Sequence, residues 1–337
     1  MKYFKSILFF FLFFLCFKIV ISSDMLANKL YIESLGIEYT DKYKITLFSP
    51  SSLSVGKSES SSDVGSTVIT IESESLEDLF NKAEASTDFE INYRHLKSVV
   101  FHKSYLSYDM LKNFIYFIIN SEAFDFDFYI FTTEEKLSDI YSFKNPDNVS
   151  SYYSILDIDS HNLYLFDFVN PVKFTNFIYF FDYKNNTIKI PLISSEKLYT
   201  IDNKEEISLY ISGVSLINSN KISIIYQNDY VNLRYLNSSD ETLYYLKDFK
   251  LIVKSCHTKY KYKNNLKIDI AIIYKNLYEE ISEDVVIESL TKNISLNLNQ
   301  LYSEGIDYLN LEYINYLYNK SYTISDVKLN LELKKYK

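Results

Sequence analysis

From about residue 151 to 274, apolar residues recur at every second position, and this spacing restricts the possible folds of the chain most. The tail, with 286–298, 308–318 and 327–333, fits either strands or helices. Side chains of a β-strand point alternately to its two faces, so the period predicts strands with one buried face. Asn185-Asn186 and Asn264-Asn265 stand between such segments, and asparagine tolerates the left-handed backbone of tight hairpin turns. The segments with this pattern are 164–168, 174–181, 187–192, 207–217, 221–226, 230–236, 249–256 and 266–274. Residues 151–337 are therefore predicted to form a β-rich region, mainly antiparallel and built as a sandwich or barrel.

The region 75–150 has a different pattern, in which helices and strands alternate. Ser75 precedes apolar residues at helical spacing, and Ser107 precedes a second such stretch at 111–119. A buried strand is predicted between them, at 96–101. These features predict a small α/β unit with the order β-α-β-α, so the fold class of the whole chain is α+β. Ahead of this unit, 24–48 is predicted to be an extended segment, and the serine-rich stretch 49–74 a flexible loop or linker.

The first 23 residues have the three parts of a secretory signal peptide. Lys2 and Lys5 supply the positive charge, residues 7–17 form an unbroken apolar run, and residues 20–23 offer a tolerable cleavage site. An uncleaved membrane anchor is the alternative, but the apolar run is shorter than the ~20 residues that a spanning helix needs. No later segment is predicted to span a membrane. The expected location is therefore secreted or lumenal: extracellular, vacuolar or within a secretory organelle.

The charge and the amino-acid usage bear on partners and source. With 35 Lys and Arg against 44 Asp and Glu, the chain carries a net charge of −9, which speaks against nucleic acid as a partner. The chain has only 5 glycines and its basic residues are almost all lysine, while tyrosine occurs 33 times. Mutational bias towards AT-rich codons explains this usage better than folding does. A protozoan parasite with an AT-rich genome is the predicted source.

Removal of the signal peptide would remove Cys16 and leave Cys256 as the one cysteine of the mature chain. An intramolecular disulfide is then excluded. Three fates are open to Cys256: a buried inert thiol, an intermolecular disulfide or a catalytic nucleophile. The neighbouring His257 cannot act as its base, because adjacent residues of a strand point to opposite faces.

No catalytic or cofactor-binding motif stands out. The five glycines are too far apart to form a phosphate-binding loop, and no Gly-x-Ser-x-Gly or His-Glu-x-x-His is present. Asp157, Asp159 and His161 would share one face of a strand, but the further ligands of a metal site cannot be placed. We therefore predict no cofactor and no metal, leave catalytic residues unassigned, and favour a protein that is not an enzyme.

Two sets of residues are candidates for modification or binding. Lys259, Lys261 and Lys263 lie on one face of a predicted strand and reverse the acidic character of the chain locally. They could bind an anionic ligand such as a sulfated glycan or an acidic membrane surface, or they could guard an edge strand against pairing. The acceptor pattern for N-glycosylation occurs at Asn148, Asn185, Asn237, Asn293 and Asn319.

Together these features predict a secreted, non-catalytic, β-rich protein that binds a protein, a glycan or a surface. Its many tyrosines favour this prediction, because tyrosine is enriched at interfaces. The alternatives are a secretory-pathway hydrolase, whose site is assembled from distant carboxylates and histidine, and an ER-lumenal subunit of a membrane complex. The sequence leaves the oligomeric state open.

Overall fold

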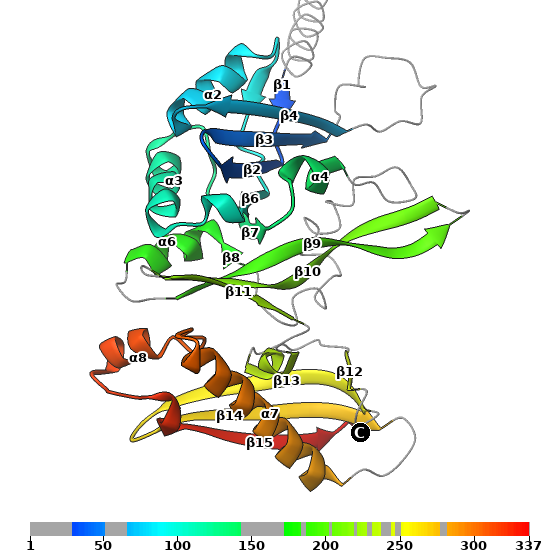
Figure 1. Ribbon diagram of the computed structural model, residues 1–337, viewed down its shortest axis with the longest axis vertical. Coiled ribbons are helices and arrows are strands. Elements are labelled where there is room, and N and C mark those ends of the chain that lie inside the picture. The colour runs from blue at the N-terminus through cyan, green and yellow to red at the C-terminus, as the bar shows by residue number, and fades with distance from the viewer. Residues whose placement is uncertain are drawn as a thin grey trace, which may run out of the picture.

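The computed structural model shows a chain built around a large N-terminal sheet and a smaller C-terminal sheet (Figure 1). A short two-stranded sheet of β1 and β5 accompanies the large one. The structure describes residues 29–50, 66–142, 172–182, 187–201, 204–218, 221–227, 231–236, 244–246, 251–276 and 282–336.

The large sheet mixes parallel and antiparallel strands in the order β11-β10-β9-β7-β6-β2-β3-β4, with β8 paired to β7. Its centre, from β2 through β6 and β7 to β9, is parallel, whereas both ends are antiparallel. The strands of the large and the short sheet are β1 (Lys29–Tyr31), β2 (Ser34–Tyr39), β3 (Tyr43–Pro50), β4 (Ser66–Ser73), β5 (Glu90–Asn92), β6 (Ser98–His102), β7 (Tyr129–Thr133), β8 (Val172–Lys173), β9 (Ile188–Ile201), β10 (Lys204–Ile217) and β11 (Ile222–Tyr226).

Helices cover both faces of this sheet, so its central strands are buried on both sides. Val99 and Phe101 of β6 lie in one cluster of buried residues, whereas Val100 lies in the other. Helices α2 (Leu76–Ala85), α3 (Tyr108–Asn120) and α6 (Phe174–Asp182) contribute to the first cluster, and α4 (Leu137–Ser142) contributes to the second. Alternate residues of a strand thus pack against helices on opposite faces.

The starts of α2 and α3 are where the sequence predicts them. The Ser75 hydroxyl accepts a hydrogen bond from the backbone N–H of Asp78 at 3.2 Å, and Ser107 does the same for Met110 at 3.2 Å. Each serine thereby satisfies an N–H of the first turn that has no partner within the helix.

Two segments predicted as strands are helical instead. Residues 174–181 form most of α6, in which Phe174 and Phe177 are fully buried and Tyr179 is 66% exposed. A short continuous apolar run fits both a helix and a buried strand, and here the buried positions are three residues apart. Residues 230–236 give the 3-10 helix η3 (Val231–Leu236), which packs against the C-terminal sheet.

The C-terminal sheet has the order β12-β13-β14-β15, and a long helix lies across one of its faces (Figure 1). β13 and β14 form the hairpin predicted at Asn264-Asn265, with Tyr262 paired to Leu266. The remaining elements are β12 (Tyr244–Leu246), β13 (Leu251–Tyr262), β14 (Leu266–Asn276), α7 (Glu283–Ser303), α8 (Leu311–Tyr318), the 3-10 helices η1 (Lys103–Tyr105) and η5 (Ile324–Asp326), and β15 (Val327–Lys335).

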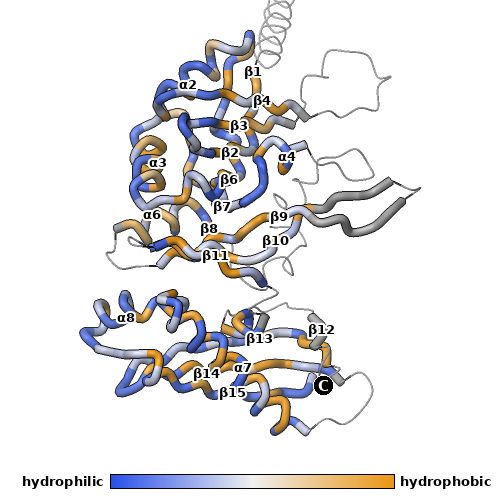
Figure 2. The backbone as a smooth tube through the Cα atoms, viewed as in Figure 1, coloured by the Kyte–Doolittle hydropathy of each residue, from blue (hydrophilic) through white to orange (hydrophobic). Residues whose placement is uncertain are grey.

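The face of the C-terminal sheet that meets α7 is apolar. Val286, Leu290, Ile294, Leu298 and Leu301 form the buried stripe of α7. Figure 2 shows apolar stretches along α7 and along β14, the strand beneath it. This core continues into the large sheet, since residues of β9, β10 and β11 belong to the same cluster.

The predicted α+β fold class is confirmed, and the structure divides its β-rich second half between two sheets. β9, β10 and β11 extend the N-terminal sheet, whereas β12 to β15 form the sheet beneath α7. Within the predicted linker, β3 continues to Pro50 and β4 occupies Ser66–Ser73. The predicted strand at 164–168, the Asn185-Asn186 turn and residues 51–65 lie outside the described residues.

Candidate functional site

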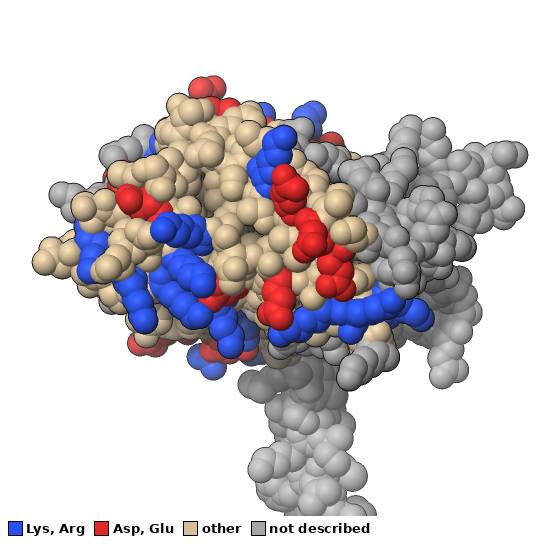
Figure 3. All heavy atoms as spheres, turned by 90° about the horizontal axis from the view of Figure 1, so that it is seen from below, with Lys and Arg blue, Asp and Glu red and all other residues tan. Residues whose placement is uncertain are grey.

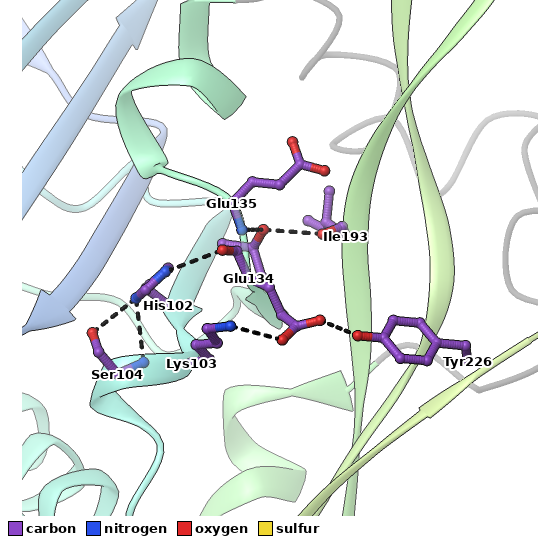
Figure 4. A network of polar contacts seen from close by, with 8 residues as sticks. His102, Lys103, Ser104, Glu134, Glu135, Ile193 and Tyr226 are labelled. Carbon is purple, nitrogen blue, oxygen red and sulfur yellow. Dashed lines mark hydrogen bonds and ion pairs between the residues drawn. The ribbon is translucent and has the colours of Figure 1, made fainter.

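A network of polar side chains lies where β6 and β7 end, at the carboxyl edge of the parallel strands (Figure 4). His102 ends β6, Lys103 and Ser104 follow it in η1, and Glu134 and Glu135 follow β7. Tyr226, the last residue of β11, reaches the network from the far edge of the sheet. This edge is where ligands commonly bind in open α/β sheets, so its chemistry decides whether it is a site.

His102 and Ser104 resemble a base and a nucleophile, but their hydrogen bonds fit a structural role. Nδ1 of His102 lies 2.8 Å from Oγ of Ser104 and also accepts from the Ser104 backbone N–H at 3.2 Å. Nε2 lies 3.3 Å from the Glu134 carbonyl oxygen, to which it donates in the tautomer that this network favours. The Ser104 hydroxyl accepts in turn from the backbone N–H of Tyr39 at 3.1 Å. Both ring nitrogens are therefore occupied, and His102 serves as the cap of η1.

Glu134 joins two elements that are far apart in the sequence. Lys103 Nζ donates to one carboxylate oxygen at 3.0 Å, and the Tyr226 hydroxyl donates to the other. Burial acts to raise the pKa of Glu134. The hydrogen bonds from Tyr226 and Lys103, together with the charges of Lys103 and His102, outweigh burial, so the pKa lies below the usual value. Glu134 is thus a paired carboxylate, not a proton donor poised near neutral pH.

Hydrogen bonds of the same network also connect β7 to β9. The Thr133 hydroxyl donates to the Ile193 carbonyl oxygen at 3.0 Å and accepts from the Glu135 N–H at 3.1 Å. A Glu135 carboxylate oxygen accepts from the backbone N–H of Ser195 at 2.6 Å. The polar groups of this edge therefore satisfy one another, and we assign them to holding the sheet together.

A pocket of about 590 Å³ lies elsewhere, where the large sheet meets the C-terminal unit. Its walls come from α6, from the ends of β9 and β13, and from α8 with the segment before it. Lys189 of β9 lines the pocket, and its Nζ lies 3.8 Å from the centre of the Tyr308 ring. The Thr187 N–H donates to the Asn310 side-chain oxygen at 3.0 Å, which links the two halves of the molecule at this point. No sequence motif marks Lys189, because it is one polar residue alternating with Ile188 and Ile190.

The predicted basic residues lie on the open face of the C-terminal sheet, opposite α7. Lys259 and Lys261 are exposed there, and Lys263 is exposed in the β13–β14 turn. Lys261 pairs with Asp269 at 2.5 Å, and its hydrogen bond is the main cause that lowers the pKa of Asp269 to about 2. In the view from below, lysine side chains gather in a band across this unit (Figure 3). Binding of an anionic ligand by these lysines stays a prediction.

Cys256 and His257 point to opposite sides of β13, as the sequence predicts for adjacent strand residues. Cys256 is only 2% exposed, and its Sγ donates to the Tyr235 carbonyl oxygen at 3.6 Å. Burial raises the pKa of this thiol to about 11. An intermolecular disulfide would require Cys256 to leave this position, and a thiol with a raised pKa is a poor nucleophile.

The burial of Cys256 leads to a prediction about its reactivity. In the chain without residues 1–23, an aromatic disulfide reagent at pH 8 is expected to label Cys256 at least roughly 100-fold more slowly than the urea-unfolded chain, because the thiolate is scarce. Absorbance of the released thiolate measures the rate, and a Cys256→Ser variant gives the background. Equal rates with and without urea would contradict the buried position.

The other predicted residues are spread over the molecule. Asn293 lies within α7 beside the fully buried Ile294, and Asn319 follows the last residue of α8 with a left-handed backbone. Asn148, Asn185, Asn237 and the Asp157–His161 group lie outside the described residues. Among the described residues, no group of three or more His, Cys, Asp or Glu side chains is arranged to bind a metal ion. In the same part of the chain, no helix is long and apolar enough to cross a membrane.

Comparison with known proteins gave three matches. A crystal structure of the GerBC protein aligns with 90% of this chain and 97% of its own, with a TM-score of 0.48 and 15% sequence identity. An uncharacterized protein of Borreliella burgdorferi is 32% identical over 130 residues, which is 38% of this chain and 26% of the length of that protein. Residues 23–195 match the family described as the spore germination protein N-terminal domain.

These matches overturn the predicted function and source. The expectation of a secreted protozoan binding protein is wrong, because the family is one of spore germination proteins and the relative is bacterial. The codon bias inferred from the composition is no guide here, since AT-rich genomes occur in bacteria as well. The predicted secretion, glycosylation and parasite origin find no support in the matches, and neither does a hydrolase or an ER-lumenal subunit. The match covers residues 23–195, more than half of the sequence, and the chain belongs to the family of the spore germination protein N-terminal domain.

Proposed function

We propose that this chain is a subunit of a membrane-associated bacterial receptor complex of the germinant-receptor kind, in which it acts by binding other proteins. The family match carries this proposal, because it extends over the large sheet from β1 into β9. The N-terminal signal would place the chain outside the cytoplasmic membrane. A protein partner agrees with this role, whereas a glycan or nucleic-acid partner has no support.

The hairpin of β9 and β10 is the element that we expect to contact a partner protein. β9 pairs with β7 only at Leu192 and Ile193, and β10 pairs with β11 only from Gly213 onward. Beyond these points, the two strands pair with each other as far as Ile201 and Lys204, and no third described strand joins them. This two-stranded extension of β9 and β10, which we call the arm, points away from the sheet (Figure 1).

A two-stranded ribbon is marginally stable by itself and presents free strand edges. Such edges are suited to adding a strand from another protein. We therefore infer that the arm docks on another subunit through backbone hydrogen bonds, and that the large sheet holds the arm in position.

The test is native electrophoresis of detergent-solubilised membranes from the source bacterium, with the chain tagged at its C-terminus. We expect the wild-type chain to migrate in a complex that also contains a multispanning membrane protein. Recovery of the wild-type chain only as a free monomer would overturn the proposed function.

A shortened arm separates the role of the arm from that of the complex. Replacing residues 196–208 with Asn-Gly joins Ser195 to Leu209, which are paired neighbours, through a two-residue turn that suits a hairpin. We expect this variant to melt within a few degrees of the wild type and to leave the complex. A variant that stays in the complex would show that another surface makes the contact.

A further inference from the structure

The pocket between α6 and α8 contains a lysine whose ammonium group forms no ion pair with any described residue. Lys189 is partly buried, and among the described residues it makes no hydrogen bond or ion pair. Its ammonium group lies over the Tyr308 ring instead, at 3.8 Å from the ring centre. A cation over an aromatic face is stabilised, but the ring supplies no negative charge to compensate it.

The acidic residue whose charge acts on Lys189, Asp307, is hydrogen-bonded to other groups. Asp307 acts on Lys189 only through its charge, and its two carboxylate oxygens accept from the Leu311 and Glu312 N–H groups at 2.8 and 2.9 Å. The Tyr302 hydroxyl donates to the same carboxylate. Burial lowers the pKa of Lys189 to about 8, and the charge of Asp307 opposes this shift. The ammonium group is therefore mostly protonated at neutral pH.

Tyrosines form much of the remaining wall of the pocket. Tyr262 and Tyr318 stack with their ring centres 4.6 Å apart and an interplanar angle of 18°. Tyr179 on the opposite side is 66% exposed, and Leu317 is 49% exposed. Exposed rings around a concave surface can bind a flat apolar group from both sides.

We propose that this pocket binds a small organic anion with a planar apolar body, of the aromatic carboxylate class. The carboxylate pairs with the Lys189 ammonium, and the ring lies among the tyrosines. A volume of about 590 Å³ is within the range of small-molecule sites. This site goes beyond the proposed receptor role, and it does not depend on any partner protein.

The test is an NMR titration of the chain without residues 1–23 with benzoate, and separately with benzamide. The two probes have nearly the same shape, but only benzoate carries a charge. We expect benzoate to bind and to shift resonances around Lys189, and benzamide to bind at least about tenfold more weakly. Equal binding of both probes, or binding of neither, would overturn the proposal.

Substitutions at Lys189 identify the charge that is recognised. Lys189→Met keeps an unbranched apolar chain and is expected to lose benzoate binding, whereas Lys189→Arg keeps the charge and is expected to restore part of it. Lys259→Met is the matched control, because Lys259 is exposed on the open face of the C-terminal sheet. Benzoate binding that survives Lys189→Met, or that falls equally with Lys259→Met, would refute the assignment.

Discussion

Replacing Gly213 with alanine is expected to lower the free energy of unfolding by about 3 to 5 kcal/mol. A Cβ at this position would lie 2.1 Å from the Ile225 carbonyl oxygen and 2.9 Å from the Tyr226 Cα. Both atoms belong to the backbone of β11, so no side chain can turn aside to relieve the contact. β11 would have to shift, and the hydrogen bond from Tyr226 to Glu134 would be lost with it. Urea denaturation followed by circular dichroism measures the change.

Gly305→Ala is the matched control for this prediction, since it is the same substitution in open space. Gly305 has a φ of 75°, and the nearest atom to an added Cβ is Lys221 Nζ at 3.8 Å. Its cost is expected to be about 1 to 2 kcal/mol, from the left-handed backbone alone. If Gly213→Ala were no more costly than Gly305→Ala, then β11 would not lie against β10 as described.

The parts of the fold that the sequence predicts correctly depend on short-range signals. The start of α3 follows from Ser107 and the apolar stripe behind it, and the β13–β14 hairpin follows from Asn264-Asn265. Residues 174–181 are predicted as a strand, but their short apolar run fits a helix as well, and packing selects the helix α6. For α3 and the β13–β14 hairpin the information lies within a few residues of the element, whereas for α6 it lies in the packing.

The architecture and the pocket depend on contacts between distant residues. The pairing of Thr132 with Leu192 joins strands from the two halves of the chain, and neither strand has a sequence feature that selects the other. The pocket likewise combines Lys189 of β9 with Tyr262 of β13 and Tyr318 of α8. The lysines at 259–263 form a recognisable sequence pattern because they are close together, whereas Lys189 acquires its surroundings only in the folded chain.

Replacing Asp307 with alanine is expected to destabilise the protein by about 3 kcal/mol and to weaken benzoate binding. Asn310 precedes α8 with a left-handed backbone and makes no side-chain cap hydrogen bond. The carboxylate of Asp307 takes its place, accepting from the N–H groups of Leu311 and Glu312 and from the Tyr302 hydroxyl. Burial and this carboxylate raise the pKa of Tyr302, so its hydroxyl remains a donor. Loss of Asp307 therefore removes the carboxylate that three donors share.

The consequences of losing Asp307 extend from the α7–α8 corner to the pocket, because α8 carries Leu317 and Tyr318 in its wall. Thermal and urea unfolding measure the loss of stability, and the benzoate titration measures the effect on the site. Asp307→Asn keeps one acceptor oxygen and should fall between the wild type and Asp307→Ala. Glu312→Gln, on the exposed first turn of α8, is the control and should change stability by less than about 0.5 kcal/mol. If Asp307→Ala were as mild as Glu312→Gln, the N–H groups of α8 would have other acceptors, and Asp307 would be free to pair with Lys189. The pocket would then contain a compensated cation and no reason to bind an anion.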